Sequence, residues 1–273
     1  MASKQSLSSA LATCTSALRK ADIPTARLDA LLLLEHVTGQ DRAHILAEPE
    51  LELNPEQAHQ LDVLVQRRAR HEPMAYIRGQ AEFYGRSFAV NKHVLVPRPE
   101  SEIIIDLAVQ LRPTKLIDVG TGSGALAITA ALELPKAQVL ALDIDPACLE
   151  VTQQNVQALA PGRVETRMSN LLQTVSDPVL TASLLLCNLP YVPDDLQINR
   201  AARHEPQLAL FAGPDGLDLY RELFMQLAER PPKTRPSHIF CESLPSQHSD
   251  LNKLASDHGW QLKAEQDFIQ CFI

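Results

Sequence analysis

No stretch of the 273-residue sequence is long and apolar enough to cross a bilayer, so a membrane-spanning helix is not expected. The first residues contain no apolar core of a secretion signal, which favours a cytoplasmic protein. The net charge of −8 is the opposite of the basic excess that nucleic-acid-binding domains carry. Stable nucleic-acid binding is therefore not expected, although a protein partner or a small local contact with nucleic acid stays open.

Cysteine and histidine are both poorly arranged for metal binding. The five cysteines include no C-x-x-C pair, and the nine histidines show no H-E-x-x-H spacing. Scattered cysteines in odd number favour reduced thiols over a disulfide framework or a zinc site. We therefore expect no metal. What the chain does have is a hydrophobic fraction of 45%, which is typical of a globular protein with one large or two smaller domains.

Residues 1–73 are predicted to form a small all-α domain. Apolar residues recur every three or four positions in 6–21 and 25–37, which is the spacing of one helix face. Asp41 and Asn54 are placed to cap further helices, and Pro55 follows Asn54 at the first helical position. The basic group at the end of the last helix is either a solvated helix end or a contact with an RNA- or protein-bound substrate. It consists of Arg67, Arg68 and Arg70.

Residues 74–98 change in character and predict a β-hairpin linker. Short apolar runs at 83–84, 88–90 and 94–96 are separated by turn residues. The stretch ends in Pro97-Arg98-Pro99-Glu100, where two prolines fix the backbone and present Arg98 and Glu100 at defined positions. These two side chains either mark a rigid corner before a helix or line a substrate pocket.

From residue 99 to 273, apolar strands alternate with helices, which predicts an α/β domain with a parallel sheet covered on both faces. The expected strands are 115–119, 138–143, 163–168, 182–186 and 238–241. Residues 261–273 favour two final strands in antiparallel order. We expect the carboxyl ends of the parallel strands to carry the functional residues.

A glycine-rich loop follows the first of these strands. Gly120, Gly122 and Gly124 let the backbone approach a nucleotide-like ligand closely, and Asp143 at the end of the next strand suits a ribose diol. The spacing alone also fits the dinucleotide-binding fingerprint. Asp118, just before the glycines, would repel a pyrophosphate but can face the ammonium group of an amino acid.

The stretch Cys187-Asn188-Leu189-Pro190-Tyr191 follows the apolar strand at 182–186. The Asn188 side-chain oxygen can accept one N–H, and the backbone carbonyl of Leu189 can accept another. Tyr191 can form an apolar wall against a flat group. This combination favours a site that holds a planar –NH2 group for methylation, for which a dehydrogenase has no use.

Two motifs carry a family resemblance. Asp118-Val119-Gly120-Thr121-Gly122-Ser123-Gly124 resembles the donor-binding motif of S-adenosylmethionine (SAM) methyltransferases, and residues 188–191 resemble the N-P-P-Y motif of those that methylate planar amino nitrogens. With the stretches 73–79, 97–102 and 203–210, the chain is similar to the HemK/PrmC family of protein-(glutamine-N5) methyltransferases. Leu189 departs from the family pattern, which has proline there, and the last hairpin is expected to be shorter.

The resemblance implies a seven-stranded Rossmann-like SAM-dependent methyltransferase domain (99–273), preceded by the helical domain and the hairpin linker. It implies SAM as methyl donor, S-adenosylhomocysteine as product, and the glutamine of the Gly-Gly-Gln motif in peptide-chain release factors as substrate, in support of translation termination. The helical domain and linker would help to hold the release factor, and nothing demands more than a monomer. The implied donor-binding residues are Asp118, Gly120, Thr121, Gly122, Gly124, Asp143, Asn170 and Asn188. The implied catalytic and substrate-binding residues are Asn188, Leu189 through its carbonyl, Pro190, Tyr191, Arg98 and Glu100.

Three other interpretations remain at this point. The amino-holding motif suits adenine N6 or cytosine N4 as well as glutamine, so a nucleic-acid methyltransferase is an alternative. Leu189 leaves open a SAM-binding module without catalysis. A nicotinamide dehydrogenase is the remaining alternative, through the glycine loop alone.

Overall fold

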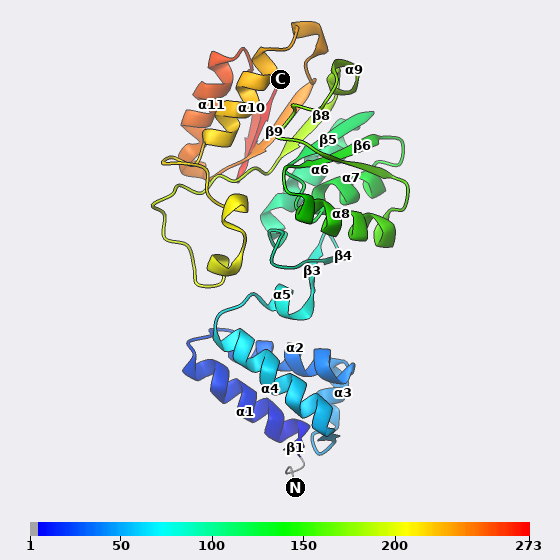
Figure 1. Cartoon of the computed structure of the whole chain (residues 1–273), viewed down its shortest axis with the longest axis vertical. Helices are drawn as coiled ribbons and strands as arrows, with labels where there is room; N and C mark the ends of the chain where they lie inside the picture. The colour runs from blue at the N-terminus through cyan, green and yellow to red at the C-terminus, as the bar shows by residue number, and fades with distance from the viewer. Residues whose placement is uncertain (1–4) are drawn as a thin grey trace. The chain divides into compact units, whose positions relative to one another are not determined.

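The computed structural model describes residues 5–273, which divide into two compact units. One unit runs to Gly79 and includes 199–204, and the other comprises 80–198 and 205–273 (Figure 1). Within the described residues, no helix combines the length and the apolar character that a bilayer crossing requires. The two units are described separately below.

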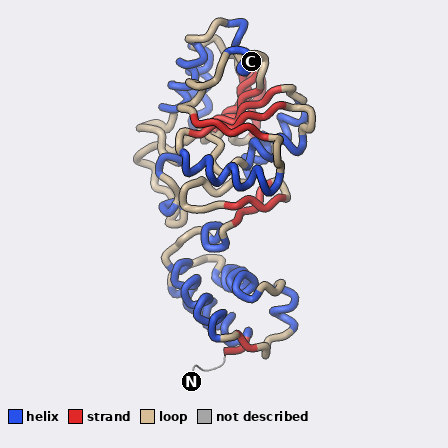
Figure 2. Tube along the Cα trace, turned by 45° about the vertical axis from the view of Figure 1, so that its right-hand side comes forward, coloured by secondary structure: helices blue, strands red, loops and turns tan. Residues whose placement is uncertain are grey.

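The first unit is a bundle of short helices (Figure 2). Its helices are α1 Leu7–Lys20, α2 Ala26–Thr38, α3 Arg42–Ala47, α4 Pro55–Ala69 and α5 Met74–Arg78. Two-residue strands β1 Gln5–Ser6 and β2 Glu52–Leu53 pair antiparallel. Asp41 caps α3, and Asn54 caps α4 in a capping box with Gln57, so both predicted caps are confirmed.

The arginines at the end of α4 are tied into this unit. Arg68 pairs with Asp29 at 2.6 Å, and the two side chains are only 12% and 6% exposed. Arg67 pairs with Glu72 at 2.5 Å, and Arg70 is exposed. The interpretation as a solvated helix end was therefore wrong for Arg68, whose buried partner the sequence does not reveal, whereas the Arg67 side chain remains 38% exposed beside Glu72.

The stretch predicted as a hairpin linker begins with a helix instead. Pro73 precedes α5, and Gly79, in the left-handed region at φ 73°, ends it. The hairpin itself is β3 Gln80–Phe83 and β4 Arg86–Ala89, joined by Tyr84 and Gly85, which both have positive φ. That two-residue turn matches the twist of the paired strands. Residues 94–96 form no strand, so the third apolar run was wrongly read as part of the hairpin.

The second unit is built on a seven-stranded sheet in the order β10-β11-β9-β8-β5-β6-β7, which confirms the predicted fold class. The strands are β5 Lys115–Val119, β6 Gln138–Asp143, β7 Val164–Met168, β8 Leu184–Cys187, β9 His238–Glu242, β10 Leu262–Gln266 and β11 Ile269–Phe272. Strands β9, β8, β5, β6 and β7 are parallel. Strand β11 is antiparallel to both of its neighbours, β9 and β10, so β10 runs in the same direction as the five parallel strands. The chain order reverses between β5 and β8, which is where ligands bind in open α/β sheets.

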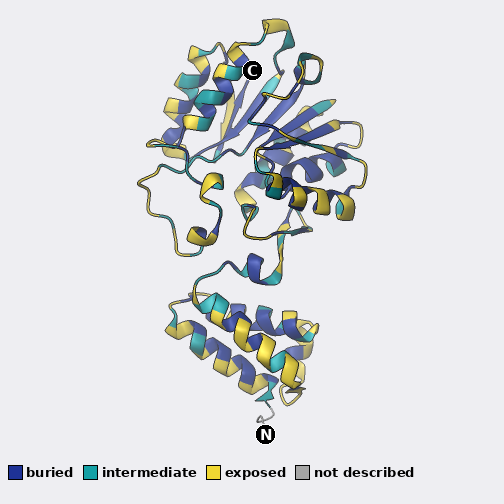
Figure 3. Cartoon of the chain, in the orientation of Figure 1, coloured by how far each residue is buried: buried dark blue, intermediate teal, exposed yellow. Residues whose placement is uncertain are grey.

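Helices cover both faces of this sheet (Figure 1). The helices α6 Glu102–Leu111, α7 Ala125–Glu133 and α8 Pro146–Leu159 lie on one side, and α10 Asp218–Ala228 and α11 His248–Asp257 on the other. Consecutive strand residues enter the two cores in turn, for example Leu184 and Leu185. The strands are accordingly buried (Figure 3). The short elements of this unit are α9 Asp177–Leu180, η1 Pro99–Ser101, η3 Gln207–Ala209, η4 Pro232–Thr234 and η5 Pro245–Gln247, whereas η2 Ala202–His204 belongs to the first unit.

Candidate active site

Strand register brings the glycine loop and the Asn188 motif side by side. Val119 at the end of β5 is paired with Cys187 at the end of β8. Gly120 follows β5 and Asn188 follows β8, so the two residues lie at the same level along the edge of the sheet. Cys187 is in turn paired with Cys241 on β9, so that Glu242 ends at this level too. Three neighbouring strands thus bring Gly120, Asn188 and Glu242 to one edge of the sheet.

The glycine loop is held in shape by Asp118. Oδ2 of Asp118 accepts a hydrogen bond from Thr121 Oγ1 at 2.6 Å and another from the backbone N–H of Ala127 at 3.1 Å. The other oxygen, Oδ1, is buried and has no hydrogen-bond partner among residues 5–273. Burial raises the pKa of Asp118 from 3.8 to about 7, against the lowering effect of these hydrogen bonds. A buried carboxyl with one unpaired oxygen is suited to a cationic ligand group such as an ammonium.

Asp118→Asn is expected to stabilise the ligand-free protein above neutral pH. Because the folded pKa is raised, Asp118 contributes stability that is present at low pH and lost as pH rises toward about 7. Asparagine removes this titration, so the free energy of unfolding of the variant relative to the wild type should rise by about 2–3 kcal/mol between about pH 5 and about pH 8. Urea titrations at each pH measure this difference, and a difference independent of pH would contradict the assignment.

Asp143 follows the same pattern at the end of β6. Its Oδ2 accepts from the Gly122 N–H at 2.9 Å, and its Oδ1 accepts from the Asp145 N–H at 3.0 Å. Burial raises the pKa of Asp143 in spite of these hydrogen bonds. Each oxygen keeps a lone pair for a further donor, so the carboxylate can accept from two neighbouring hydroxyls while it shapes the loop.

Asn170 lies two residues beyond β7 and is half-buried. Its Nδ2 donates to Glu222 Oε1 at 2.9 Å, which leaves its side-chain oxygen as acceptor. Ile144, directly after Asp143, is 60% exposed and presents apolar surface at this edge of the sheet. Sequence reasoning did not single out Ile144, although its place after Asp143 was a signal.

Asn188 belongs to a chain of four side chains. Asn188 Nδ2 donates to Ser101 Oγ at 2.9 Å, and Ser101 Oγ donates to Glu242 Oε2 at 2.6 Å. Tyr191 OH donates to the other carboxylate oxygen, Oε1, at 3.1 Å. Ser101 and Glu242 are both buried. Sequence reasoning missed these two residues; the signal for Glu242 was its place directly after the apolar strand 238–241.

Burial is the largest influence on the pKa values of Glu242 and Tyr191, the two titratable side chains among these four. It raises the pKa of Glu242, against the lowering effect of the hydrogen bonds from Ser101 and Tyr191. Burial, and next the charge of Glu242, raises the pKa of Tyr191 well above its ordinary value, so that Tyr191 stays a neutral donor.

Two cavities meet at Asn188. One is lined by the glycine loop, with Gly120, Thr121 and Gly122. The other is lined by the residues around Tyr191, with Ala209, Leu210 and Glu242. Asn188, Leu95 and Arg98 line both. A larger groove lies at the opposite, amino ends of β5, β6 and β7 and contains none of these residues.

The two residues of the proline corner differ in their placement. Arg98 Nη2 pairs with Glu205 Oε1 at 2.5 Å, and Glu205 Oε2 accepts from the Val96 N–H at 3.0 Å. Glu205 is only 4% exposed, and sequence reasoning did not assign it a role. Glu100 is exposed and lines neither cavity. The structure therefore brings Arg98 to the site and leaves Glu100 outside it.

Leu189, the departure from the family motif, is buried at 2% exposure. A Cβ on Gly120 would lie 3.2 Å from Leu189 Cδ2, so the leucine side chain packs against the glycine loop. Leu189 also belongs to the core that includes Leu185 and Tyr220. The side chain therefore joins the loop after β8 to the loop after β5.

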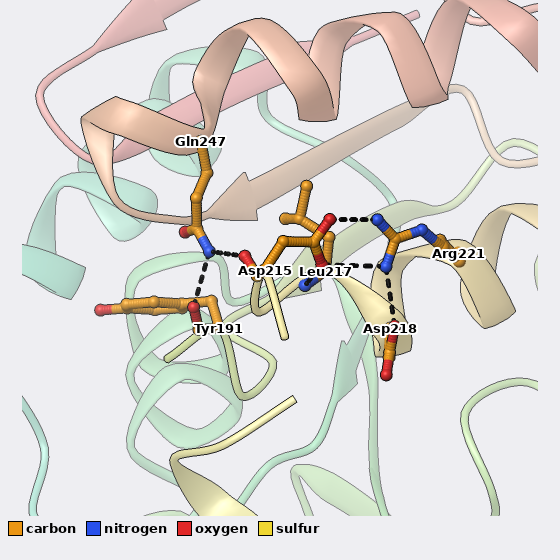
Figure 4. A network of polar contacts seen from close by, with 6 residues as sticks. All are labelled: Tyr191, Asp215, Leu217, Asp218, Arg221 and Gln247. Atoms are coloured by element: carbon orange, nitrogen blue, oxygen red, sulfur yellow. Dashed lines mark hydrogen bonds and ion pairs between the residues drawn. The ribbon is translucent and has the colours of Figure 1, made fainter. Parts of the chain in front are cut away.

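The backbone of Tyr191 is fixed by a second network (Figure 4). Gln247 Nε2 donates to Tyr191 O at 2.8 Å and to Asp215 O at 2.6 Å. Arg221 pairs with both Asp215 and Asp218, which anchors the loop before α10. Gly216 directly follows Asp215 in this loop, and a Cβ added to it would lie 2.1 Å from Tyr191 O. Glycine is required here both by the close approach and by its φ of +76°.

Gly216→Ala is expected to destabilise the protein and to displace Tyr191. Gly162 is a matched control, because it has nearly the same φ of +74° but no atom within 4 Å of an added Cβ. Gly162→Ala should cost about 1–2 kcal/mol of unfolding free energy from backbone strain alone. Gly216→Ala should cost more than its control and should also lower kcat. Equal losses of stability, measured by urea unfolding, would show that the contact with Tyr191 has no role.

Comparison with known proteins places these features in a family. Residues 9–79 match the PrmC N-terminal domain, and residues 104–189 match the ribosomal protein L11 methyltransferase (PrmA) family model. The release factor glutamine methyltransferase of Koribacter versatilis is 39% identical over 84% of this chain and 82% of that protein. The release factor glutamine methyltransferase of Deinococcus radiodurans is 35% identical over 94% of this chain and 92% of that protein.

Among solved structures, the hMettl16 catalytic domain in complex with an RNA hairpin superposes with a TM-score of 0.54. The match covers 82% of each chain at 14% identity and shows the fold alone. The sequence relatives go further, because they cover most of both chains, including the glycine loop and the residues around Asn188. The chain belongs to the PrmC/HemK family of release factor glutamine methyltransferases.

Proposed function

We propose that this protein transfers a methyl group from SAM to the side-chain amide nitrogen, N5, of the glutamine in the Gly-Gly-Gln motif of peptide-chain release factors. One observation carries the proposal. Asn188 lines both cavities, and its Nδ2 is occupied by Ser101, which leaves its Oδ1 to accept an N–H of a substrate amide. The helical unit, which matches the PrmC N-terminal domain, is proposed to hold the release factor.

The residues around the glycine loop fit SAM. The unpaired Oδ1 of Asp118 suits the ammonium group of the methionine part, and the two oxygens of Asp143 suit the ribose hydroxyls. Gly122 has no atom within 4 Å of an added Cβ, so this part of the loop is open to a ligand. Asn170 and Ile144 are proposed to lie beside the adenine. Bound SAM supplies a methyl group already activated by a sulfonium, so the proposed reaction needs no metal.

The proposed mechanism is positioning by hydrogen-bond acceptors. A glutamine amide nitrogen is a weak nucleophile, because its lone pair is delocalised into the carbonyl. Asn188 Oδ1 accepts one N–H, and the carbonyl of Leu189 accepts the other, which directs the nitrogen toward the methyl group. Both acceptors also stabilise the positive charge that develops on the nitrogen as the N–CH3 bond forms and the S–CH3 bond breaks. The donor would leave as the neutral thioether S-adenosylhomocysteine, and the methylated nitrogen would lose one proton to water. Tyr191 packs against the flat amide. Pro190 lies between Leu189 and Tyr191 and restricts the backbone of this loop.

A labelled-methyl assay tests the proposal. Label should pass from SAM to a purified release factor, and a release factor whose Gly-Gly-Gln glutamine is replaced should stay unlabelled. Nucleic acid that contains adenine or cytosine should take up no label. The net charge of −8 agrees with this expectation, because it opposes binding to the phosphate backbone. Label in nucleic acid but not in release factor would replace the proposal with a nucleic-acid methyltransferase.

The proposal also states that the protein acts as a monomer and in the cytoplasm.

A further inference from the structure

The Asn188 side chain can present either of two opposite groups to a substrate. Its amide oxygen and its amide nitrogen are nearly equal in size, but the first only accepts and the second only donates hydrogen bonds. The function proposed above requires the oxygen to face the substrate. Something in the protein must therefore decide between the two orientations of this amide.

Ser101 connects Asn188 to a buried carboxylate. Its Oγ lies 2.9 Å from Asn188 Nδ2 and 2.6 Å from Glu242 Oε2. A hydroxyl has one proton to donate, and an ionised carboxylate can only accept. The Ser101 proton therefore goes to Glu242, and only lone pairs of Ser101 remain for Asn188. Only the NH2 group of Asn188 can satisfy them, so its oxygen is turned away from Ser101.

The second oxygen of Glu242 is also engaged. Tyr191 OH donates to Oε1 at 3.1 Å, and Tyr191 lines the same cavity as Asn188. Glu242 is 1% exposed and Ser101 is 3% exposed, so water does not compete for these bonds. One buried carboxylate thus orders the two side chains that are proposed to meet the substrate amide.

We infer that Ser101 and Glu242 are positioning residues that hold the Asn188 amide with its oxygen toward the substrate. This inference rests on the proposed function, since it states how the amide-holding residue is oriented. Neither residue is proposed to touch the substrate. Ser101 acts on Asn188 directly. Glu242 acts on it through the Ser101 hydroxyl and also through its own interaction with the Asn188 amide, whose NH2 group it too attracts.

The link through Ser101 makes the orientation of Asn188 depend on pH. A protonated Glu242 could donate to Ser101, and the Ser101 hydroxyl could then donate to Asn188, which would favour the reversed amide. The ionised form is therefore the active one, and kcat should fall as pH falls through the pKa of Glu242. Burial raises that pKa, so the loss should begin at a higher pH than for an ordinary glutamate. The other charged or titratable groups near Glu242 and Tyr191 are Glu100, Arg98 and Tyr220.

Ser101→Ala and Ser101→Thr form the test pair, because alanine removes the hydroxyl and threonine keeps it. Ser101→Ala is expected to lower kcat roughly tenfold or more, because it removes the hydroxyl that links Asn188 to the charged Glu242, and a hydrogen bond to a charged group contributes about this much. Ser101→Thr should stay within about threefold of the wild type, and calorimetry should show unchanged SAM affinity in both. The fall of kcat at acid pH should disappear in Ser101→Ala and in Glu242→Gln. Equal losses in the alanine and threonine variants, or an unchanged acid limb in both Ser101→Ala and Glu242→Gln, would overturn the inference.

A second readout does not depend on methyl transfer. The Nδ2 protons of Asn188 can be assigned by nuclear magnetic resonance through their absence in Asn188→Ala. One of them should shift on Ser101→Ala and keep its position on Ser101→Thr, since it donates to the hydroxyl. No shift in the alanine variant would overturn the inference. If the signals behave as expected but the wild type does not methylate release factors, the proposed function fails and the orientation of Asn188 stands.

Discussion

Asn188→Ala is expected to lower kcat by roughly 10²–10³-fold, because it removes a preorganised acceptor from the site where charge develops. The Asn188 oxygen is proposed to hold the amide nitrogen and to stabilise its positive charge, and alanine offers nothing in its place. SAM affinity should change little, since the glycine loop and Asp143 remain. Initial rates with release factor, together with calorimetry for SAM, separate the two effects.

Asn91→Ala is the matched control for this change. Asn91 is exposed, and its Oδ1 accepts from the His93 N–H at 2.9 Å in a surface turn away from both cavities. It should keep the wild-type kcat. A loss of SAM affinity in Asn188→Ala as large as its loss of kcat would mean that Asn188 serves donor binding and not the transfer step.

Asp143→Ala is expected to weaken SAM binding roughly 10²-fold, from the loss of charge-assisted hydrogen bonds to two hydroxyls. The change also frees the Gly122 and Asp145 N–H groups, so the glycine loop loses part of its support. Calorimetry with SAM and with S-adenosylhomocysteine measures the effect, and both ligands should weaken alike because they share the ribose.

Asp145→Ala provides the comparison for Asp143. Asp145 caps α8 by accepting from the Ala147 N–H at 2.8 Å, so its loss should cost about 1 kcal/mol of stability. Its backbone N–H to Asp143 is retained, and SAM affinity should stay near the wild-type value. If Asp143→Ala bound SAM as tightly as Asp145→Ala, the ribose would have to be held elsewhere.

Local features of this protein were predictable from the sequence, because each depends on neighbouring residues. The caps at Asp41 and Asn54 and the glycine loop after β5 are of this kind. The position of Asn188 was predictable as well, since an apolar strand leads directly into it. The helix α5 was missed because five residues between Pro73 and Gly79 are too few to show a helical period.

Long-range partners could not be predicted in this way. Ser101 and Glu242 are 141 positions apart in the chain, and Arg98 and Glu205 are 107 apart. Glu242 ends β9, Ser101 lies in η1, and Arg98 and Glu205 lie in loops, so each pair depends on how the whole fold, including the strand order, brings distant segments together. Strand order is a property of the whole sheet, and a single sequence does not specify it locally. The buried partner of Arg68 was not foreseen either, because Asp29 is 39 positions away on another helix.

Leu189 is the position where this chain departs from its family motif. Proline would fix the backbone at this point. In this protein the leucine side chain is buried and packs against Gly120, so the two loops are joined by packing. The carbonyl acceptor that the proposed mechanism uses is a backbone group and is present with either residue.

Tandem mass spectrometry of a release factor incubated with SAM and this protein tests the central claim most directly. The wild type should add the mass of one methyl group to the Gly-Gly-Gln glutamine, with fragment ions that place it on the side chain, and Asn188→Ala should leave that peptide unmodified over the same time. An unmodified glutamine after incubation with folded, SAM-binding wild-type protein, or equal modification by the Asn188→Ala variant, would contradict the account.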